Sequence, residues 1–175
     1  MAEQDIAAAL ERVRSFFERK PALAMHDDAP ATARWTGGLR VVASHDSGLS
    51  VATDMPTEFG GTGDQVTPGW LFRAGVSTCA NASILMAAAA RGITLQALEV
   101  KATSRSDARG LLGMADAGGA PVYAGPGDMQ LHVKLRAPGV AQAELRALVD
   151  AALSQSPIPS AVTHATALAL QLDLG

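Results

Sequence analysis

The chain has 175 residues, of which 48% are hydrophobic, and this is enough to bury the core of one domain of ordinary size. Its formal net charge is −3, so it lacks the basic surface through which proteins bind the phosphates of DNA or RNA. We therefore expect no nucleic-acid partner.

The start of the chain predicts an amphipathic helix. Apolar residues fall at helical spacing between Glu3 and Lys20, with charged residues between them, and Pro21 ends the run. The charges interrupt any apolar stretch of the kind found in signal peptides. The longest apolar stretch, near residues 84–90, is too short and too rich in alanine to span a membrane. We expect a soluble cytoplasmic protein with no membrane partner.

The next part of the chain predicts a meander of antiparallel strands. Short runs at residues 31–36, 39–44 and 49–53 are separated by Gly37-Gly38 and by the turn-forming residues 45–48. A loop rich in proline, glycine and aspartate follows at residues 55–66.

A long apolar helix is predicted from Pro68 to Arg91, with Thr67 as N-cap and Gly92 at the C-terminal cap. The helix has almost no polar face, which is typical of a helix in the interior. It would be roughly 36 Å long, more than one small domain readily covers, and this favours burial in a dimer interface.

The C-terminal half alternates between strands and a helix. Strands are predicted at residues 93–104 and 129–136, with a loose excursion at 105–127 between them. A helix follows at residues 140–153, Pro157 and Pro159 break it, and the last strand is expected at the alternating leucines 168–174. No βαβ alternation is present, so the fold class is α+β.

Few chemistries fit the polar residues. The glycine-rich loop lacks the lysine of a phosphate-binding loop, and His26, His45, His132 and His164 are scattered. We expect no metal and no cofactor. The one cysteine, Cys79, cannot form a disulfide within the chain, and any nucleophilic or redox chemistry must take place on it.

The residues around Cys79 resemble a known family. Phe59-Gly-Gly-Thr-Gly, Thr67-Pro68, the leucine-containing helix to Cys79 and the later Arg91-Gly92-Ile93 resemble the OsmC/Ohr pattern of hydroperoxide-resistance proteins. The tail Ser156-Pro-Ile-Pro-Ser-Ala-Val is similar to the Cys-Pro-Val-Ser segment of that family. The resemblance covers residues 31–175 as one OsmC-like domain, and residues 1–30 are an N-terminal helical extension.

The resemblance implies a fold and a reaction. Two chains intertwine into a homodimer, in which antiparallel sheets surround long buried central helices. A first cysteine, matched by Cys79, attacks the peroxide, and a second closes the sulfenic acid into a disulfide. An arginine and a glutamate hold the first thiol as a thiolate.

The sequence departs from this pattern at three positions. Ser156 stands at the position of the second cysteine, and Gly69, followed by Trp70, stands at that of the glutamate. The loop at residues 54–59, where the resemblance led us to expect the arginine, has none. Arg73 lies about 120° around the helix from Cys79, whereas Phe72 and Val76 lie nearer its face. We therefore expect apolar surroundings for Cys79, which disfavour a thiolate.

Two functions remain open. The first is hydroperoxide defence in the oxidative stress response, by a thiol peroxidase that uses Cys79 and an external thiol reductant. The alternative is a catalytically inactive OsmC-like dimer that binds a small apolar ligand. Gly69, Trp70, Phe72 and Val76 are the candidates for lining a pocket, either for the organic hydroperoxide or for that ligand.

Overall fold

The computed structural model describes the backbone of residues 3–175 and the side chains of residues 5–175. The chain divides into two compact units. One comprises residues 11–75, and the other comprises residues 76–175 together with the start of the chain up to Leu10. The fold class is α+β, as expected, with two antiparallel sheets and a long central helix.

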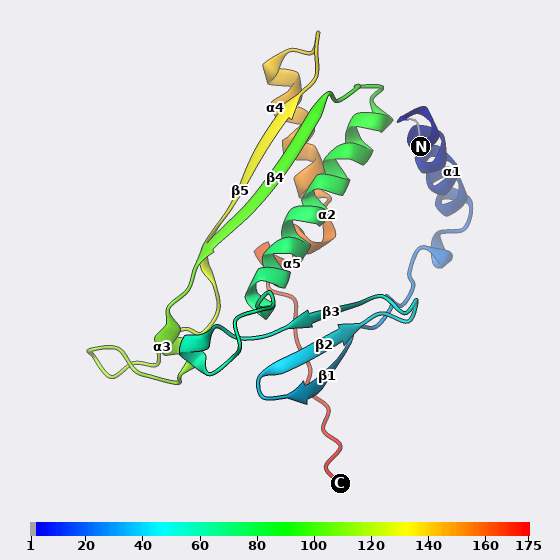
Figure 1. Ribbon diagram of the computed structural model, residues 1–175. Coiled ribbons are helices and arrows are strands. Elements are labelled where there is room, and N and C mark those ends of the chain that lie inside the picture. Colours follow the sequence, from blue (N-terminus) through cyan, green and yellow to red (C-terminus); the bar gives the residue numbers. More distant parts are fainter. Residues whose placement is uncertain (1–2) are drawn as a thin grey trace. The chain divides into compact units, whose positions relative to one another are not determined.

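The expected meander forms the sheet of the first unit. Its strands are β1 (Thr32–Gly37), β2 (Arg40–Ser44) and β3 (Ser50–Thr53), paired antiparallel in the order β1-β2-β3 (Figure 1). A 3₁₀ turn, η2 (Thr57–Phe59), lies in the loop that follows β3. Before the sheet come the amphipathic helix α1 (Glu3–Arg19) and a second 3₁₀ turn, η1 (Pro21–Leu23).

Helix α2 (Pro68–Ala90) begins and ends where its capping residues predict. The Thr67 hydroxyl accepts a hydrogen bond from the backbone N–H of Trp70 at 3.1 Å, which satisfies one free donor of the first turn. Gly92 has a φ of 66°, the left-handed conformation in which glycine commonly ends a helix. Residues 68–75 of α2 belong to the first unit and residues 76–90 to the second.

In the second unit, α2 and the later helix α4 (Gln142–Ser154) pack on one face of a long hairpin. The hairpin consists of β4 (Ala97–Arg105) paired antiparallel with β5 (Gly127–Arg136) (Figure 1). Helix α4 is followed by α5 (Pro157–Thr163). The excursion between the strands contains the short helix α3 (Ala108–Leu111). The core joins Ile84 and Ala88 of α2 to Leu148, Val149 and Ala152 of α4. The leucines and valines on the inner face of β4 and β5 pack against it.

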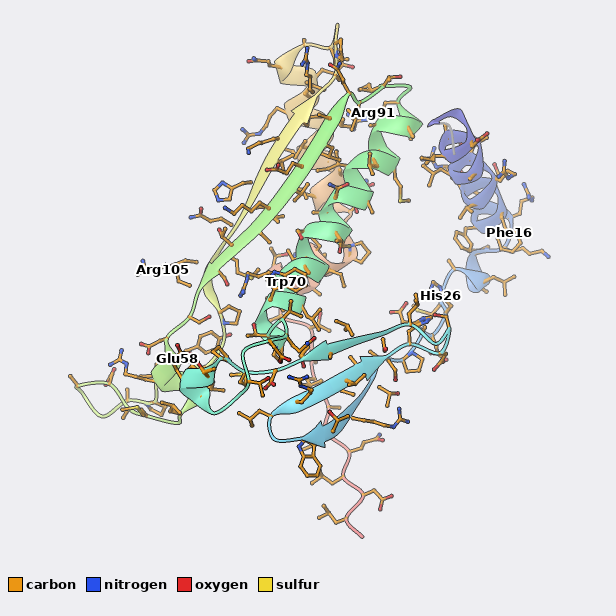
Figure 2. The ribbon with its side chains drawn as sticks, in the orientation of Figure 1. Phe16, His26, Glu58, Trp70, Arg91 and Arg105 are labelled. Atoms are coloured by element: carbon orange, nitrogen blue, oxygen red, sulfur yellow. The ribbon has the colours of Figure 1, made fainter. Side chains whose placement is uncertain are left out.

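One face of α2 is buried against the rest of residues 5–175. Val76, Ala80, Ile84 and Ala88 recur every four residues and are at most 3% exposed. The other faces expose Leu85, Met86 and Phe72, and Trp70 in the first turn is 49% exposed (Figure 2). The central helix of the α+β fold is thus confirmed, and it retains apolar surface that the described residues leave exposed.

The length and composition of α2 resemble those of a membrane-spanning helix. Among the described residues, α2 is the one helix that is long enough and apolar enough to cross a membrane. Core helices of water-soluble domains meet the same criteria, so this observation is weak evidence for a membrane segment.

The expected last strand is wrong. Residues 165–175 have no regular secondary structure, and Leu168, Leu170, Leu172 and Leu174 are 69% to 98% exposed. The alternation of leucines has the period of a strand, but a strand needs the edge of another strand to satisfy its backbone groups. No strand of the described residues pairs with this segment.

Candidate functional site

Cys79 lies on α2 in contact with the turn that joins α4 to α5. Its Sγ is 3.3 Å from the Ser156 hydroxyl, which is completely buried. The backbone N–H of Ile158 donates a hydrogen bond to the same sulfur at 3.4 Å. Cys79 itself is half-buried. The sulfur therefore has polar partners in a segment almost 80 residues further along the chain.

The sequence of the turn explains these contacts. Ser156 is the N-cap of α5, and Pro157 occupies the first helical position. Proline suits this position because the N–H that it lacks would have no partner within the helix. An N-cap serine usually accepts a hydrogen bond from one of the next N–H groups, but the Ser156 hydroxyl makes no such bond. Because the Ile158 N–H donates to Cys79 instead, the sulfur acts as the cap acceptor for this short helix.

These contacts correct the expectation of purely apolar surroundings. Val76, one turn before Cys79, is buried, as the helical spacing predicts. The turn at Ser156, however, is distant in sequence and brings an N–H donor to the sulfur. The sulfur thus lies against an N–H group and a hydroxyl, and not against apolar groups alone.

A second polar cluster, within the first unit, fixes the glycine-rich loop. The guanidinium of Arg40 on β2 donates to Asp54 at 3.1 Å and to Thr62 at 2.6 Å, and it also pairs with Asp64. Asp54 is 2% exposed. The hydrogen bonds from the Thr62 hydroxyl, the Met55 N–H and Arg40 lower the pKa of Asp54 to about 2, although burial opposes this shift.

Sequence reasoning missed this role of Arg40. The loop at residues 54–59 has no arginine of its own, but an arginine from a neighbouring strand reaches Asp54 at the beginning of that loop. In the β2–β3 ladder Val41 faces Thr53, so Arg40 and Asp54 are the next opposed pair. An arginine and an aspartate at opposed strand ends indicate an ion pair, and both residues can be read from the sequence.

The region that contains both Cys79 and Ser156 matches a family model. The model of OsmC-like proteins aligns with residues 61–171, which is more than half of the chain. The chain belongs to the OsmC-like protein family. Members of this OsmC/Ohr-like family are linked to organic hydroperoxide resistance. No curated protein matches the chain at a significant level.

Solved OsmC structures have the same fold. An OsmC-like protein from Mycoplasma pneumoniae is 19% identical with a TM-score of 0.66, over 80% of this chain and 90% of that one. An organic hydroperoxide resistance protein OsmC from Legionella pneumophila is 25% identical with a TM-score of 0.55, over 80% and 92%. A putative organic hydroperoxide resistance protein from Vibrio cholerae, with captopril in one of its active sites, is 25% identical with a TM-score of 0.54, over 80% and 88%.

The remaining site candidates of this OsmC-like chain lie on α2. Gly69 and Trp70 are exposed in the first turn, Phe72 is 39% exposed, and Val76 is buried. A Cβ at position 69 would lie 3.7 Å from the guanidinium of Arg73, one turn further along α2. A side chain at this position would therefore contact a cation. That these four residues line a pocket stays a prediction. The structure brings Cys79 and Ser156 together. That Ser156 stands at the position of a second cysteine stays a prediction.

Proposed function

We propose that this OsmC-like protein is a one-cysteine thiol peroxidase of the cytoplasm, which reduces organic hydroperoxides at Cys79. The observation that supports this most directly is the Ile158 N–H, which donates to Sγ beside the Ser156 hydroxyl. A thiolate is the nucleophile in such chemistry, and hydrogen-bond donors at the sulfur stabilise it.

In the proposed first step, the thiolate of Cys79 attacks the terminal oxygen of the hydroperoxide. An S–O bond forms, the O–O bond breaks, and the alkoxide leaves and takes up a proton to become the alcohol. The sulfur is oxidised to a sulfenic acid and the peroxide is reduced. The Ser156 hydroxyl, 3.3 Å from the sulfur, is placed to hydrogen-bond the thiolate before attack.

Regeneration needs a thiol from outside the chain, since Ser156 cannot form a disulfide. The external thiol attacks the sulfenic sulfur, water leaves, and a mixed disulfide forms. A second external thiol attacks this disulfide, which releases Cys79 as thiol and the reductant as its own disulfide. The protein therefore works with a monothiol or dithiol reductant and has no internal resolving step.

We also expect the working form to be a homodimer. Trp70, Phe72, Leu85 and Met86 are between 39% and 49% exposed on α2 in the single chain. Exposed apolar side chains on a central helix are typical of a surface that a partner covers. A second copy of the chain is the partner implied by the family resemblance.

Peroxide consumption tests the proposed activity. Purified protein is incubated with cumene hydroperoxide and dithiothreitol, and peroxide is measured over time beside a Cys79→Ser control. We expect turnover only in the wild-type protein. Peroxide loss no faster than in the control, together with an apolar molecule retained in native mass spectrometry, would favour the inactive ligand-binding dimer.

A further inference from the structure

A backbone nitrogen lies beside the sulfur of Cys79. The N–H of Ile158 donates a hydrogen bond to Sγ, and the nitrogen is 3.4 Å from the sulfur. Ile158 follows Pro157 in the first turn of α5, where N–H groups have no carbonyl partner within their own helix. The nitrogen can therefore exchange its hydrogen for another bond without loss of a hydrogen bond of α5.

The packing of α4 holds this nitrogen in place. Helix α4 packs on α2 through Val149 and Ala152, which cluster with Ile84. The turn that contains Ser156 follows α4 directly and leads into α5. Ser156 is completely buried, so bulk water does not reach its contact with the sulfur. A reaction that joins sulfur to nitrogen and releases water is favoured in such surroundings.

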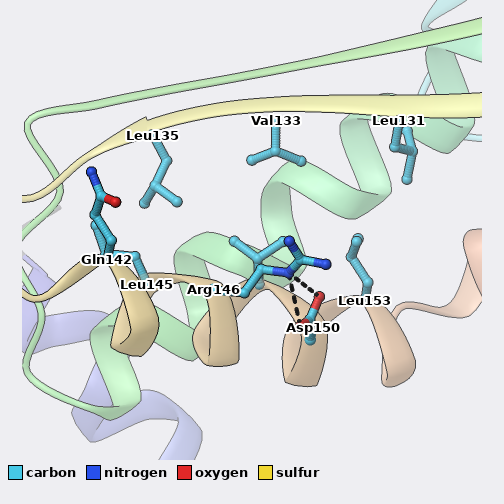
Figure 3. A pocket seen from close by; sticks show the side chains of 9 residues that line it. Leu131, Val133, Leu135, Gln142, Leu145, Arg146, Asp150 and Leu153 are labelled. Carbon is cyan, nitrogen blue, oxygen red and sulfur yellow. Dashed lines mark hydrogen bonds and ion pairs between the residues drawn. The ribbon is translucent and has the colours of Figure 1, made fainter.

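The contact is separate from the groove along α4. This groove, of about 480 Å³, lies beside β5 and is lined by apolar side chains, by Gln142 and by the ion-paired Arg146 and Asp150 (Figure 3). Neither Cys79 nor Ser156 belongs to its lining. The sulfur and the nitrogen therefore meet outside this groove.

Oxidation of Cys79 makes the nitrogen a reaction partner. The attack on a hydroperoxide proposed above leaves the sulfur as a sulfenic acid. Without an external thiol, further peroxide converts a sulfenic acid to sulfinic acid, which thiols do not reduce. A sulfenic acid also condenses either with a second thiol or with a backbone nitrogen, and the latter reaction gives a sulfenamide. The chain has one cysteine, and the nitrogen of Ile158 is already at its sulfur.

We propose that, when the external thiol is absent, the sulfenic acid of Cys79 condenses with the backbone nitrogen of Ile158 to a sulfenamide. The S–N bond forms as the S–O bond breaks, and the hydroxyl leaves with the hydrogen of the nitrogen as water. The sulfur keeps its oxidation state, so the step needs no further oxidant. This inference rests on the proposed oxidation of Cys79 by an organic hydroperoxide.

The sulfenamide lies outside the turnover cycle and protects the oxidised sulfur. When a thiol returns, it attacks the sulfur, the S–N bond breaks, and the nitrogen regains a hydrogen. The resulting mixed disulfide is the one that a second thiol reduces in the proposed cycle. The oxidised protein thus stays reducible and is kept from the irreversible sulfinic acid.

Mass spectrometry of the denatured protein tests the proposal. Purified protein is treated with one equivalent of cumene hydroperoxide without thiol. We expect a chain that has lost two hydrogens and its one free thiol, and that regains both with dithiothreitol. A tryptic digest without reductant should link peptides 74–91 and 147–175, and fragmentation should locate the bond at Ile158.

The other outcomes separate this inference from the proposed activity. A chain that gains one or more oxygens, or a doubled mass from a disulfide between two chains, would overturn the sulfenamide and still support oxidation of Cys79. An unchanged mass would contradict both the sulfenamide and the proposed attack on the peroxide.

Matched variants at position 158 test the nitrogen itself. Ile158→Pro removes the N–H within a first helical turn, where proline is tolerated, and Ile158→Ala removes the side chain but keeps the N–H. We expect Ile158→Ala to lose two hydrogens and Ile158→Pro, shown folded by circular dichroism, to gain oxygen instead. Ser156→Ala should still lose two hydrogens, because the neighbouring hydroxyl is not the partner. Loss of two hydrogens in Ile158→Pro, or none in Ser156→Ala, would overturn the assignment.

Discussion

The thiol of Cys79 and the hydroxyl of Ser156 lie 3.3 Å apart although 77 residues separate them. This contact is close enough that a second sulfur at position 156 needs only a small shift to reach the disulfide bond length of about 2 Å. Ser156 is completely buried, so the contact is protected from solvent. A cysteine at position 156 would therefore face the sulfur of Cys79.

Ser156→Cys is expected to create an intramolecular disulfide with Cys79. Treatment with one equivalent of cumene hydroperoxide should remove both free thiols, and intact mass should fall by two hydrogens. The single-cysteine wild-type protein is the control, since it cannot form this bond. Two free thiols that persist after peroxide treatment would show that positions 79 and 156 are not in contact.

Ser156→Ala is expected to slow the reaction of Cys79 with iodoacetamide at neutral pH. A hydrogen bond of about 0.5–1.5 kcal/mol to the thiolate corresponds to roughly a twofold to twelvefold change in its stability. Ser160→Ala, which leaves Ser156 in place, is the matched control. An unchanged alkylation rate would mean that the hydroxyl gives the thiolate no support.

Asp54→Asn is expected to remove part of the acid sensitivity of the fold. The pKa of Asp54 is lowered to about 2, mainly by the Thr62 hydroxyl, with the Met55 N–H and Arg40. Since an unfolded aspartate has a pKa of about 3.9, the ionised group stabilises the folded state. That stabilisation is complete above about pH 4 and is lost as the pH falls through about 2.

The melting temperature measured between pH 7 and pH 2 checks this. The wild-type protein should lose stability in the acid range, and Asp54→Asn should start less stable and lose less. Asp46→Asn, in an exposed turn, is the charge-matched control. Parallel curves for wild type and Asp54→Asn would contradict the role given to the Arg40 cluster.

Leu148→Ala tests the packing of α4 on α2. Leu148 is completely buried and packs with Ala88 of α2, so the shortened side chain leaves a cavity. We expect a loss of about 2–5 kcal/mol in the free energy of unfolding, measured with urea. Leu112→Ala, at a residue 61% exposed, should cost far less. Similar losses for both variants would place Leu148 outside the core.

Much of the fold was predictable from local patterns. The meander, the caps of α2 at Thr67 and Gly92, and α4 follow from turn residues, capping residues and apolar spacing. The prediction of a last strand was wrong. Its leucines have the period of a strand, but a strand forms only where its backbone pairs with the edge of another strand, and the alternation of leucines does not reveal such an edge.

The candidate site was only partly predictable. Helical geometry gave the neighbours of Cys79 on α2, such as Val76, but it could not reveal a turn that approaches from residue 156. The family resemblance supplied that pairing. Arg40 escaped notice because its contact with Asp54 depends on the register of β2 and β3, which local propensity does not fix.

The rate of cumene hydroperoxide reduction by the wild-type protein and by Cys79→Ser, with dithiothreitol as reductant, tests the central claim most directly. We predict turnover by the wild-type protein that depends on both peroxide and thiol, and none above background in Cys79→Ser, whose fold circular dichroism should show intact. Equal rates in the two folded proteins would contradict the assignment of peroxidase activity to Cys79.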